Sequence, residues 1–310
     1  MRSHDSPASY NPLQSRLIRG EVLILDGAMG TELDRRGVKT PLPLWSAQAL
    51  LDAPEVVRAI HEDYLRAGAD VITANTFRTT ARTMRRARRK EDDAIRLTRL
   101  AVDLAHQART NVVRGREVWI AGAMAPLEDC YQPEIAPEFD VAAAEHGIQA
   151  ARLAAAGVDL LLVETMNSIT EAVVATRAAV ATGLPVFVSF IARSDREIWS
   201  GEGLDDAVRS VDDFHPDAIL VNCVPAETAE RCLEAMSRET QTPIGCYPNA
   251  GHPDLDHGTW RHDDEKTPEW FAAHAMSWIR RGALVVGGCC GTGPGHIRAL
   301  REAVPPVLVE

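Results

Sequence analysis

Short apolar runs recur along this chain, and helical stretches lie between them. Eight such runs can be recognised: Val22–Leu25, Val71–Ala74, Val118–Ala121, Leu160–Val163, Val186–Phe190, Ala218–Val221, Ile244–Tyr247 and Ala283–Val286. Near-continuous apolar runs are typical of strands buried on both faces, as the strands of a parallel sheet are. Eight strands alternating with helices predict an α/β fold, the (β/α)8 TIM barrel. A doubly wound open sheet is the alternative, but it normally has fewer strands, and no GxGxxG motif follows the first run.

The stretches between the runs carry helix start and stop signals. Pro54 stands at a first-turn position. The apolar residues that follow it repeat at helical spacing: Val56, Val57, Ile60 and Tyr64. Ser168 and Glu171 have capping-box spacing ahead of a helix over residues 172–182. Thr267-Pro268 predicts the start of another helix, and Gly282 predicts its end.

Composition is that of an ordinary globular chain. Of 310 residues, 45% are hydrophobic and 25% are charged, and α/β barrels of this length are often a single domain. We expect one barrel domain over residues 18–310 and a flexible arm over residues 1–17, which are polar and contain Pro and Ser. No apolar run approaches the roughly 20 residues that cross a bilayer, and the N-terminus lacks the apolar core of a signal peptide. Six cysteines without such a signal indicate reduced thiols and a cytoplasmic location.

The charge distribution argues against nucleic-acid binding. The net charge is −11, which disfavours contact with a polyanion. One basic run, Arg78–Lys90, departs from this balance. It is either a patch for a polyanion or a solvated loop and helix face balanced by Glu91, Asp92 and Asp93. We favour the second interpretation, because charge runs without interleaved aromatic residues rarely specify nucleic-acid sites.

Polar residues and cysteines stand at the carboxyl ends of several predicted strands. Barrel enzymes build their active sites from these ends. The residues concerned come from different strands and would converge on one mouth: Asp26, Asn75, Glu164, Asn222, Cys223, Asn249, Cys289 and Cys290. We therefore expect the functional site there.

Three of these residues are cysteines. The adjacent Cys289 and Cys290 would pair poorly as an unstrained disulfide, whereas thiolates at a strand end suit a soft metal ion. Cys223, after the sixth run, supplies a third thiol. Three thiolates and an open fourth position describe a catalytic zinc site, and the alternative is a set of buried apolar thiols.

A zinc ion held by three thiolates suits a substrate thiol better than water, because the site carries net negative charge. Coordination deprotonates the thiol while its sulfur stays nucleophilic. A free thiol has a pKa of about 8.5 and is only a few per cent thiolate at neutral pH. The expected chemistry is attack by a thiolate on an electrophilic carbon. Cys232 and Cys246 are interpreted as packing residues, and Cys130, in a loop, is left unassigned.

Six motifs stand in order along the chain: LDGAMGTEL at Leu25–Leu33, GADVITANTF at Gly68–Phe77, ETMNS at Glu164–Ser168, VNC at Val221–Cys223, YPNAG at Tyr247–Gly251 and GGCCGTGPGHIRAL at Gly287–Leu300. This ordered set resembles the homocysteine S-methyltransferase family and covers nearly the whole chain. Departures from the family pattern occur at Phe77, which is often Tyr, and at Arg78-Thr79-Thr80, where Gln-Ala-Ser is more usual. Residues 291–295 also contain more glycine than usual.

The resemblance implies an enzyme that transfers a methyl group from a small molecule to the thiol of L-homocysteine, giving methionine. It implies zinc held by Cys223, Cys289 and Cys290, with the homocysteine sulfur as the exchangeable ligand. It also implies that Asp26 and Glu164 recognise the amino-acid end of homocysteine. The expected partners of the protein are therefore its small-molecule substrates, and we expect it to bind neither nucleic acid nor membrane.

Elementary chemistry is consistent with these roles. A carboxylate such as Glu164 suits the substrate ammonium. If the turn after the first strand opens a helix, substrate carboxylate would suit the backbone N–H groups of Gly27, Ala28 and Met29. Asp26 has helix N-capping as an alternative or additional role.

The methyl donor is the open part of this interpretation. A sulfonium or quaternary ammonium is attracted to aromatic faces. Side chains in or near the matching loops are Trp45, Phe77, Tyr247 and Met166, although each could equally be a packing residue. The folate and cobalamin modules of methionine synthases are not present in this sequence, so we expect a diffusible donor or a separate protein. S-methylmethionine is the first choice because its leaving group departs neutral, and betaine is the second.

Several alternatives remain. S-adenosylmethionine or a corrinoid protein could serve as donor. A metal-dependent barrel hydrolase would need His/Asp ligands such as HxH after the first strand, where the chain reads Asp26-Gly27-Ala28. A non-catalytic zinc- or thiol-binding protein would bind metal without forming methionine. Asn249 and Asn222 complete the expected substrate-binding set, although Asn222 either orients its loop or caps its strand. The pattern does not distinguish interface helices from core helices, so the oligomeric state is not predicted.

Overall fold

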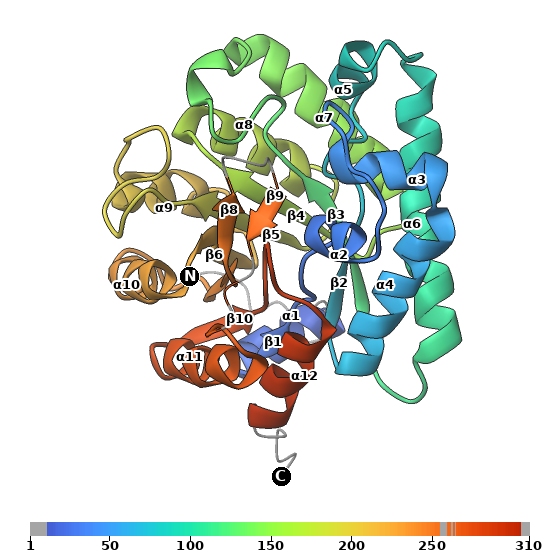
Figure 1. The fold of residues 1–310 in the computed structure, drawn as a ribbon. Helices are drawn as coiled ribbons and strands as arrows, with labels where there is room; N and C mark the ends of the chain where they lie inside the picture. The colour runs from blue at the N-terminus through green and yellow to red at the C-terminus, as the bar shows by residue number, and fades with distance from the viewer. Residues whose placement is uncertain (1–10, 255–258, 262, 264, 305–310) are drawn as a thin grey trace.

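Eight parallel strands form one ring, in the order β1-β10-β7-β6-β5-β4-β3-β2 (Figure 1). The structure is a computed structural model and describes residues 11–254, 259–261, 263 and 265–304. The strand bounds are β1 Leu23–Ile24, β2 Val71–Ala74, β3 Trp119–Met124, β4 Leu160–Met166, β5 Val186–Ile191, β6 Ala218–Pro225, β7 Ile244–Asn249 and β10 Ala283–Val286. A parallel bridge between Leu25 and Val71 joins β1 to β2 and closes the ring. The predicted (β/α)8 barrel is confirmed.

Helices cover the outside of the ring. Their bounds are α2 Gly30–Arg35, α3 Ala49–Asp52, α4 Pro54–Ala67, α5 Ala81–Arg86, α6 Asp92–Val112, α7 Phe139–Ala156, α8 Ile169–Val180, α9 Leu204–Asp212, α10 Ala226–Met236, α11 Pro268–Arg280 and α12 Pro294–Ala303. The short 3-10 turns η1 Trp45–Gln48 and η2 Pro133–Ile135 lie in loops. The predicted start signals are confirmed, because Pro54 opens α4 and the side chains of Ser168 and Thr267 cap α8 and α11. None of the helices in the described ranges is long and apolar enough to cross a bilayer.

Two strands extend past the predicted runs and become irregular there. Strand β4 continues to Met166 and β6 to Pro225, and each contains a register shift near its carboxyl end. Thr165 and Cys223, which lie in these irregular segments, both have left-handed backbone angles, with φ of 60° and 58°. These bulges redirect the side chains at the carboxyl ends of β4 and β6, as β-bulges commonly do near functional sites.

The prediction of a flexible arm over residues 1–17 is wrong for residues 12–17. They belong to helix α1, Pro12–Ile18, which begins with a capping box between Asn11 and Gln14. Leu13 and Leu17 of this helix are buried in the cluster that fills the barrel interior, beside residues such as Phe187. The Gln14 side-chain amide also donates to Asp217 over 2.8 Å. Helix α1 therefore closes the amino-terminal end of the barrel, while residues 1–10 lie outside the described ranges.

Leu13→Ala is expected to destabilise the protein by about 2–5 kcal/mol, because it leaves a cavity against the barrel interior. Leu13 has no exposed surface. Urea unfolding followed by circular dichroism measures the change. Ile18→Ala is the matched control, since Ile18 is on the same helix but 64% exposed. Equal stability of the two variants would mean that α1 does not close the barrel in solution.

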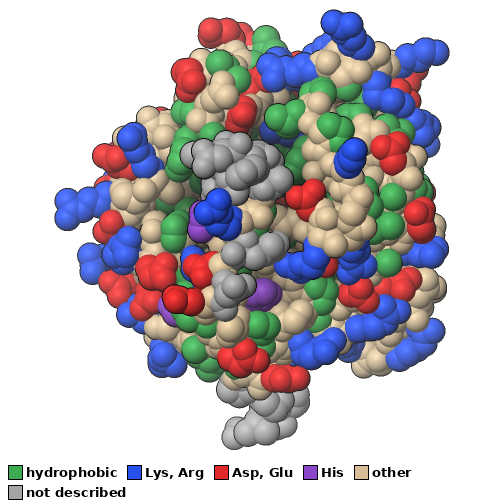
Figure 2. Space-filling view, viewed as in Figure 1, with side chains coloured by type: hydrophobic (Ala, Val, Ile, Leu, Met, Phe, Trp, Pro, Cys, Tyr) green, Lys and Arg blue, Asp and Glu red, His purple; other side chains and the backbone are tan. Residues whose placement is uncertain are grey.

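The basic run Arg78–Lys90 forms α5 and its flanks. Its ion pairs join Arg82 to Glu128 and Glu145, Arg85 to Glu91 and Glu145, Arg86 to Glu128, and Arg89 to Asp93. Over α5 and the start of α6, Figure 2 shows basic side chains with acidic ones nearby. These pairs match the interpretation of a solvated helix face balanced by acids, and Arg78 is absent from them.

A second, two-stranded sheet was not predicted. Strands β8 His252–Asp254 and β9 Thr259–Arg261 pair antiparallel between β7 and α11. The indole N–H of Trp260 in β9 donates to the Ala250 carbonyl oxygen over 3.0 Å. This bond fixes the hairpin against the end of β7, beside the barrel mouth.

Candidate active site

A cavity of about 820 Å³ opens at the carboxyl ends of the barrel strands. Most residues predicted to form the site line it: Asp26, Gly27, Ala28, Met29, Trp45, Phe77, Glu164, Cys223, Tyr247, Cys289 and Cys290. Three others that the sequence placed in the substrate site do not line it: Met166, Asn222 and Asn249. The structure therefore brings the thiols, the acids and the aromatic residues to one space.

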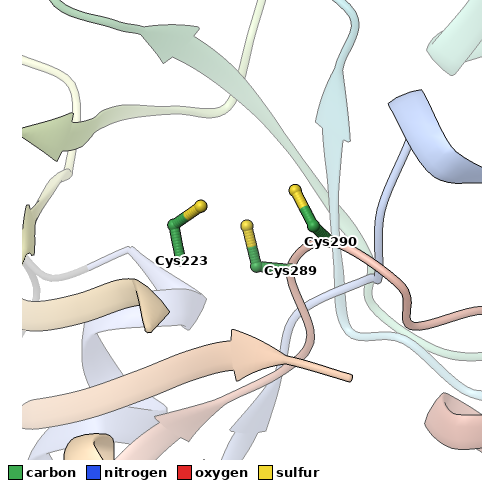
Figure 3. A group of neighbouring side chains, drawn as sticks. All are labelled: Cys223, Cys289 and Cys290. Carbon is green, nitrogen blue, oxygen red and sulfur yellow. The ribbon is translucent and has the colours of Figure 1, made fainter. Parts of the chain in front are cut away.

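The three predicted cysteine ligands converge. The sulfur atoms of Cys223, Cys289 and Cys290 all lie within 4.8 Å of one another, and Figure 3 shows them turned toward a common space at the strand ends. A tetrahedral zinc site with Zn–S bonds of about 2.3 Å separates its sulfurs by roughly 3.8 Å. The cluster fits such an ion with small side-chain adjustments, and no cysteine in the chain forms a disulfide.

Backbone hydrogen bonds fix the cysteine pair against β7. The Cys289 N–H donates to the Pro248 carbonyl over 2.8 Å, and the Ala250 N–H donates to the Cys290 carbonyl over 2.9 Å. Gly291 then turns the chain with φ of 83°, and a Cβ atom there would overlap the Ala250 carbonyl oxygen. Only glycine fits this turn, which explains why Gly291 follows the cysteine pair.

Asn222 sets the direction of Cys223. Its side-chain oxygen accepts from the Thr165 N–H over 3.1 Å and from the Ser189 hydroxyl over 2.7 Å, and its amide donates to the Thr165 hydroxyl over 2.9 Å. Asn222 thus ties the bulge of β4 to the bulge of β6 that carries Cys223. Of the two roles predicted for Asn222, the structure supports orientation of the neighbouring loop. Asn222 is fully buried and does not line the cavity.

The other two residues that do not line the cavity, Met166 and Asn249, are buried behind its wall. Met166 is fully buried in the core between the barrel and its helices, because the bulge at Thr165 turns it away from the mouth. Asn249 is buried beside Cys223, and its side chain lowers the pKa of that thiol. The carbonyl oxygen of the Asn249 side chain is buried without a hydrogen-bond donor. Both residues support the cavity from behind.

Among the three sulfurs, Cys223 takes the first negative charge. Hydrogen bonds from the thiols of Cys289 and Cys290 hold the pKa of Cys223 well below its ordinary value, and the Tyr131 hydroxyl contributes in the same direction. The pKa values of Cys289 and Cys290 are raised well above the ordinary value, chiefly by their interaction with Cys223. A divalent cation would favour the charged form of all three, which is why such a cluster suits a metal.

Asp26 and Glu164 form the acidic part of the cavity. Burial raises the pKa of Asp26 to about 7, although its carboxylate accepts from the Thr73 N–H over 2.8 Å and the Thr73 hydroxyl over 3.1 Å. Burial, and then the charge of Asp26, raise the pKa of Glu164 to about 8, while the Tyr247 hydroxyl donates to it over 3.3 Å. Two carboxyl groups held out of water in this way favour a cationic ligand group between them.

The turn after β1 differs in part from its prediction. It does lead into a helix, α2, but the helix N-cap is Met29 and has no side-chain capping bond, so Asp26 is not the cap. The Ala28 N–H already donates to the Thr292 hydroxyl over 3.3 Å. A carboxylate bound here would therefore rely on the neighbouring amide groups of Gly27 and Met29.

Aromatic side chains form another part of the wall, in the loops that follow β1 and β2. Trp45 and Phe77 pack edge to face, with ring centres 5.5 Å apart. Asn75 fixes this wall through reciprocal bonds with Ser46, over 2.8 Å from the Ser46 hydroxyl and 2.9 Å to the Ser46 carbonyl. Tyr247, predicted with the aromatic set, instead pairs with Glu164.

The cavity wall also contains residues that were not predicted to act there, among them Cys130, Tyr131 and Trp260. The Tyr131 hydroxyl lies 3.3 Å from the Cys223 sulfur. Its ring packs edge to face on Trp199, whose indole N–H donates to the Tyr131 carbonyl over 2.9 Å. Cys130 and Tyr131 lie in an irregular loop without periodicity, so no sequence signal marked them.

The sequence profile of the homocysteine S-methyltransferase family matches residues 23–304. The chain belongs to this family. Two curated homocysteine S-methyltransferases, YbgG of Bacillus subtilis (strain 168) and the enzyme of Escherichia coli (strain K12), are each 31% identical to it. The matches cover 94% of this chain and 96% and 98% of the two relatives. The resemblance predicted from the six motifs is confirmed.

A solved structure agrees with the fold. The crystal structure of the homocysteine methyltransferase MmuM from Escherichia coli, in its metallated form, matches with a TM-score of 0.82 at 29% identity. The match covers 94% of this chain and 99% of that chain. This homocysteine S-methyltransferase is therefore an enzyme that transfers a methyl group to the thiol of a small-molecule acceptor, homocysteine, as the motifs predicted.

Proposed function

We propose that this homocysteine S-methyltransferase is zinc-dependent, with Cys223, Cys289 and Cys290 as the metal ligands, and that its methyl donor is S-methylmethionine. The observation that carries the proposal is that three converging sulfurs, the two acids Asp26 and Glu164, and an aromatic pair line one cavity. The sulfurs match the thiol of homocysteine, the acids match its ammonium, and the aromatic pair matches the sulfonium of the donor.

The three thiols provide the donor set for zinc, and Asn222 and Gly291 hold them in place. Zinc, when bound, keeps the acceptor thiol deprotonated and nucleophilic at neutral pH. The Tyr131 hydroxyl, at hydrogen-bond distance from Cys223, limits the negative charge that collects on that sulfur.

The acidic pair binds and orients the acceptor. Glu164 and Asp26 receive the homocysteine ammonium, whose positive charge offsets their burial. The homocysteine carboxylate lies toward the Gly27 and Met29 amides. Held at this end, the side chain directs its sulfur toward the three thiols, and binding supplies the alignment that the reaction needs.

The aromatic wall binds the donor. The sulfonium of S-methylmethionine is attracted to the faces of Trp45 and Phe77. Transfer breaks one S–CH₃ bond of the sulfonium and forms one at the acceptor sulfur. Two molecules of methionine result, and the leaving thioether departs neutral, so no general acid is needed.

A donor panel tests this function. Zinc-loaded protein is incubated with homocysteine carrying deuterium in its side chain, together with S-methylmethionine, betaine, S-adenosylmethionine or a methylated corrinoid protein. Mass spectrometry of methionine then separates product made from the acceptor from the leaving group. We expect the highest kcat/KM with S-methylmethionine. A preference for betaine would overturn the donor assignment, and no deuterated methionine from any donor would overturn the function.

A cytoplasmic location follows from the same chemistry. All six cysteines are free. The three that would hold the metal must stay reduced for the site to form, and a reducing compartment keeps them so.

A further inference from the structure

Arg78 places a positive charge in the cavity wall, next to the aromatic pair. It lines the cavity, and its guanidinium carbon lies 5.3 Å from the centre of the Phe77 ring. Phe77 in turn packs against Trp45.

Within the described ranges, Arg78 has no carboxylate partner. Its Nη1 donates to the Glu128 backbone carbonyl over 3.0 Å, and its Nε is buried without a hydrogen-bond acceptor. The Glu128 carboxylate is already engaged by Arg82, over 2.8 Å, and by Arg86. Arg78 thus differs from Arg82, Arg85, Arg86 and Arg89 of the basic run, which pair with acids.

A guanidinium in this setting is prepared for an anionic ligand. Burial lowers the pKa of Arg78, with only partial compensation from Cys130 and Asp129, yet arginine stays protonated in proteins. Arg78 is half-buried, and a charge partly removed from water without a partner is costly. A carboxylate that bonds to its N–H fork removes that cost. The proposed function already assigns the acceptor's amino-acid end to Asp26 and Glu164.

We propose that Arg78 binds the carboxylate of the methyl donor, so that the donor class is a zwitterion with a carboxylate as well as a methylated cationic centre. This inference rests on the proposed function of the cavity. It assigns the two charges of such a donor to two neighbouring features, the cationic centre to the Trp45–Phe77 pair and the carboxylate to Arg78. A bare methylated cation would instead meet the repulsion of the guanidinium.

The test compares S-methylmethionine with its carboxamide, which keeps the sulfonium and lacks the negative charge. Wild-type protein should favour the acid over the amide by about 10- to 100-fold in kcat/KM, the effect expected for a charge-assisted hydrogen bond. Arg78→Gln should abolish this preference by raising KM for the acid, with KM for homocysteine unchanged. Arg78→Lys should keep part of it. Arg85→Gln, which removes an exposed arginine of the same run, should leave the preference intact.

Each contrary outcome is informative. Wild-type protein without a preference for the acid would overturn the role of Arg78 before any variant is made. An Arg78→Gln variant that loses activity equally with acid and amide would mean that Arg78 only supports the loop through the Glu128 carbonyl. In both cases deuterated methionine is still formed, so the proposed function stands. Absence of that product in wild-type protein with both donors would remove both proposals.

Discussion

Replacing Cys290 with alanine is expected to remove zinc and methyl transfer together. The sulfurs of Cys223, Cys289 and Cys290 are mutual neighbours within 4.8 Å, and two thiolates cannot hold zinc against competing ligands as three can. We expect the zinc content to fall from about one equivalent to near zero and kcat/KM to fall at least about 30-fold, since only a few per cent of the acceptor thiol is then ionised at neutral pH. Elemental analysis and methionine formation measure the two effects.

Cys232→Ala is the matched control for this variant. Cys232 is also a buried free cysteine, but it lies on α10 outside the cluster. It should cost some stability and leave zinc content and turnover close to wild type. A Cys290→Ala protein that turns over at the wild-type rate without zinc would contradict the role of the three thiols.

Glu164→Gln is expected to weaken homocysteine binding while zinc stays bound. The substitution keeps the size of the side chain and the contact with the Tyr247 hydroxyl but removes the charge that faces the substrate ammonium. Loss of a hydrogen bond between charged groups raises KM for homocysteine by about 10- to 100-fold. Steady-state kinetics at saturating donor, with elemental analysis of zinc, measure this. An unchanged KM would exclude the ammonium role.

The same variant is also expected to change how the stability of the protein depends on pH. The pKa of Glu164 is raised to about 8 and that of Asp26 to about 7, so both groups bind protons more tightly in the folded protein than in the unfolded chain. Their contribution to stability is complete below their unfolded pKa values and is lost as the pH rises through about 7 to 8. Substrate-free Glu164→Gln should therefore lose less stability than wild type as the pH increases. Melting temperatures at acidic and alkaline pH measure the difference, and identical pH profiles would contradict it.

The barrel could be predicted from the sequence because its signals are local. Each strand is an apolar run, and several helices have their own start residues, such as Pro54 and Ser168. The strand ends then place distant residues at one mouth, which is why the sequence brought Cys223 and Glu164 into one site. Elements that depend on distant partners were missed. The sequence of helix α1 resembled a polar arm because only its two leucines, Leu13 and Leu17, are buried. The β8–β9 hairpin has no apolar run of its own.

The finer geometry of the site could not be predicted because it depends on bulges. The left-handed backbone at Thr165 and Cys223 is held by Asn222, through bonds that span 57 residues of sequence from Thr165 to Asn222. These bulges turn Met166 into the core and leave Asn222 behind the cavity wall. Tyr131 reaches Cys223 from an irregular loop, where neither spacing nor composition marks it.

The most direct test of the central claim is zinc K-edge X-ray absorption of the metal-loaded protein, with and without homocysteine. We expect three sulfur neighbours in the substrate-free protein and four when homocysteine is bound. A count that stays at three in saturated, active protein would mean that the acceptor sulfur does not join the cluster of Cys223, Cys289 and Cys290.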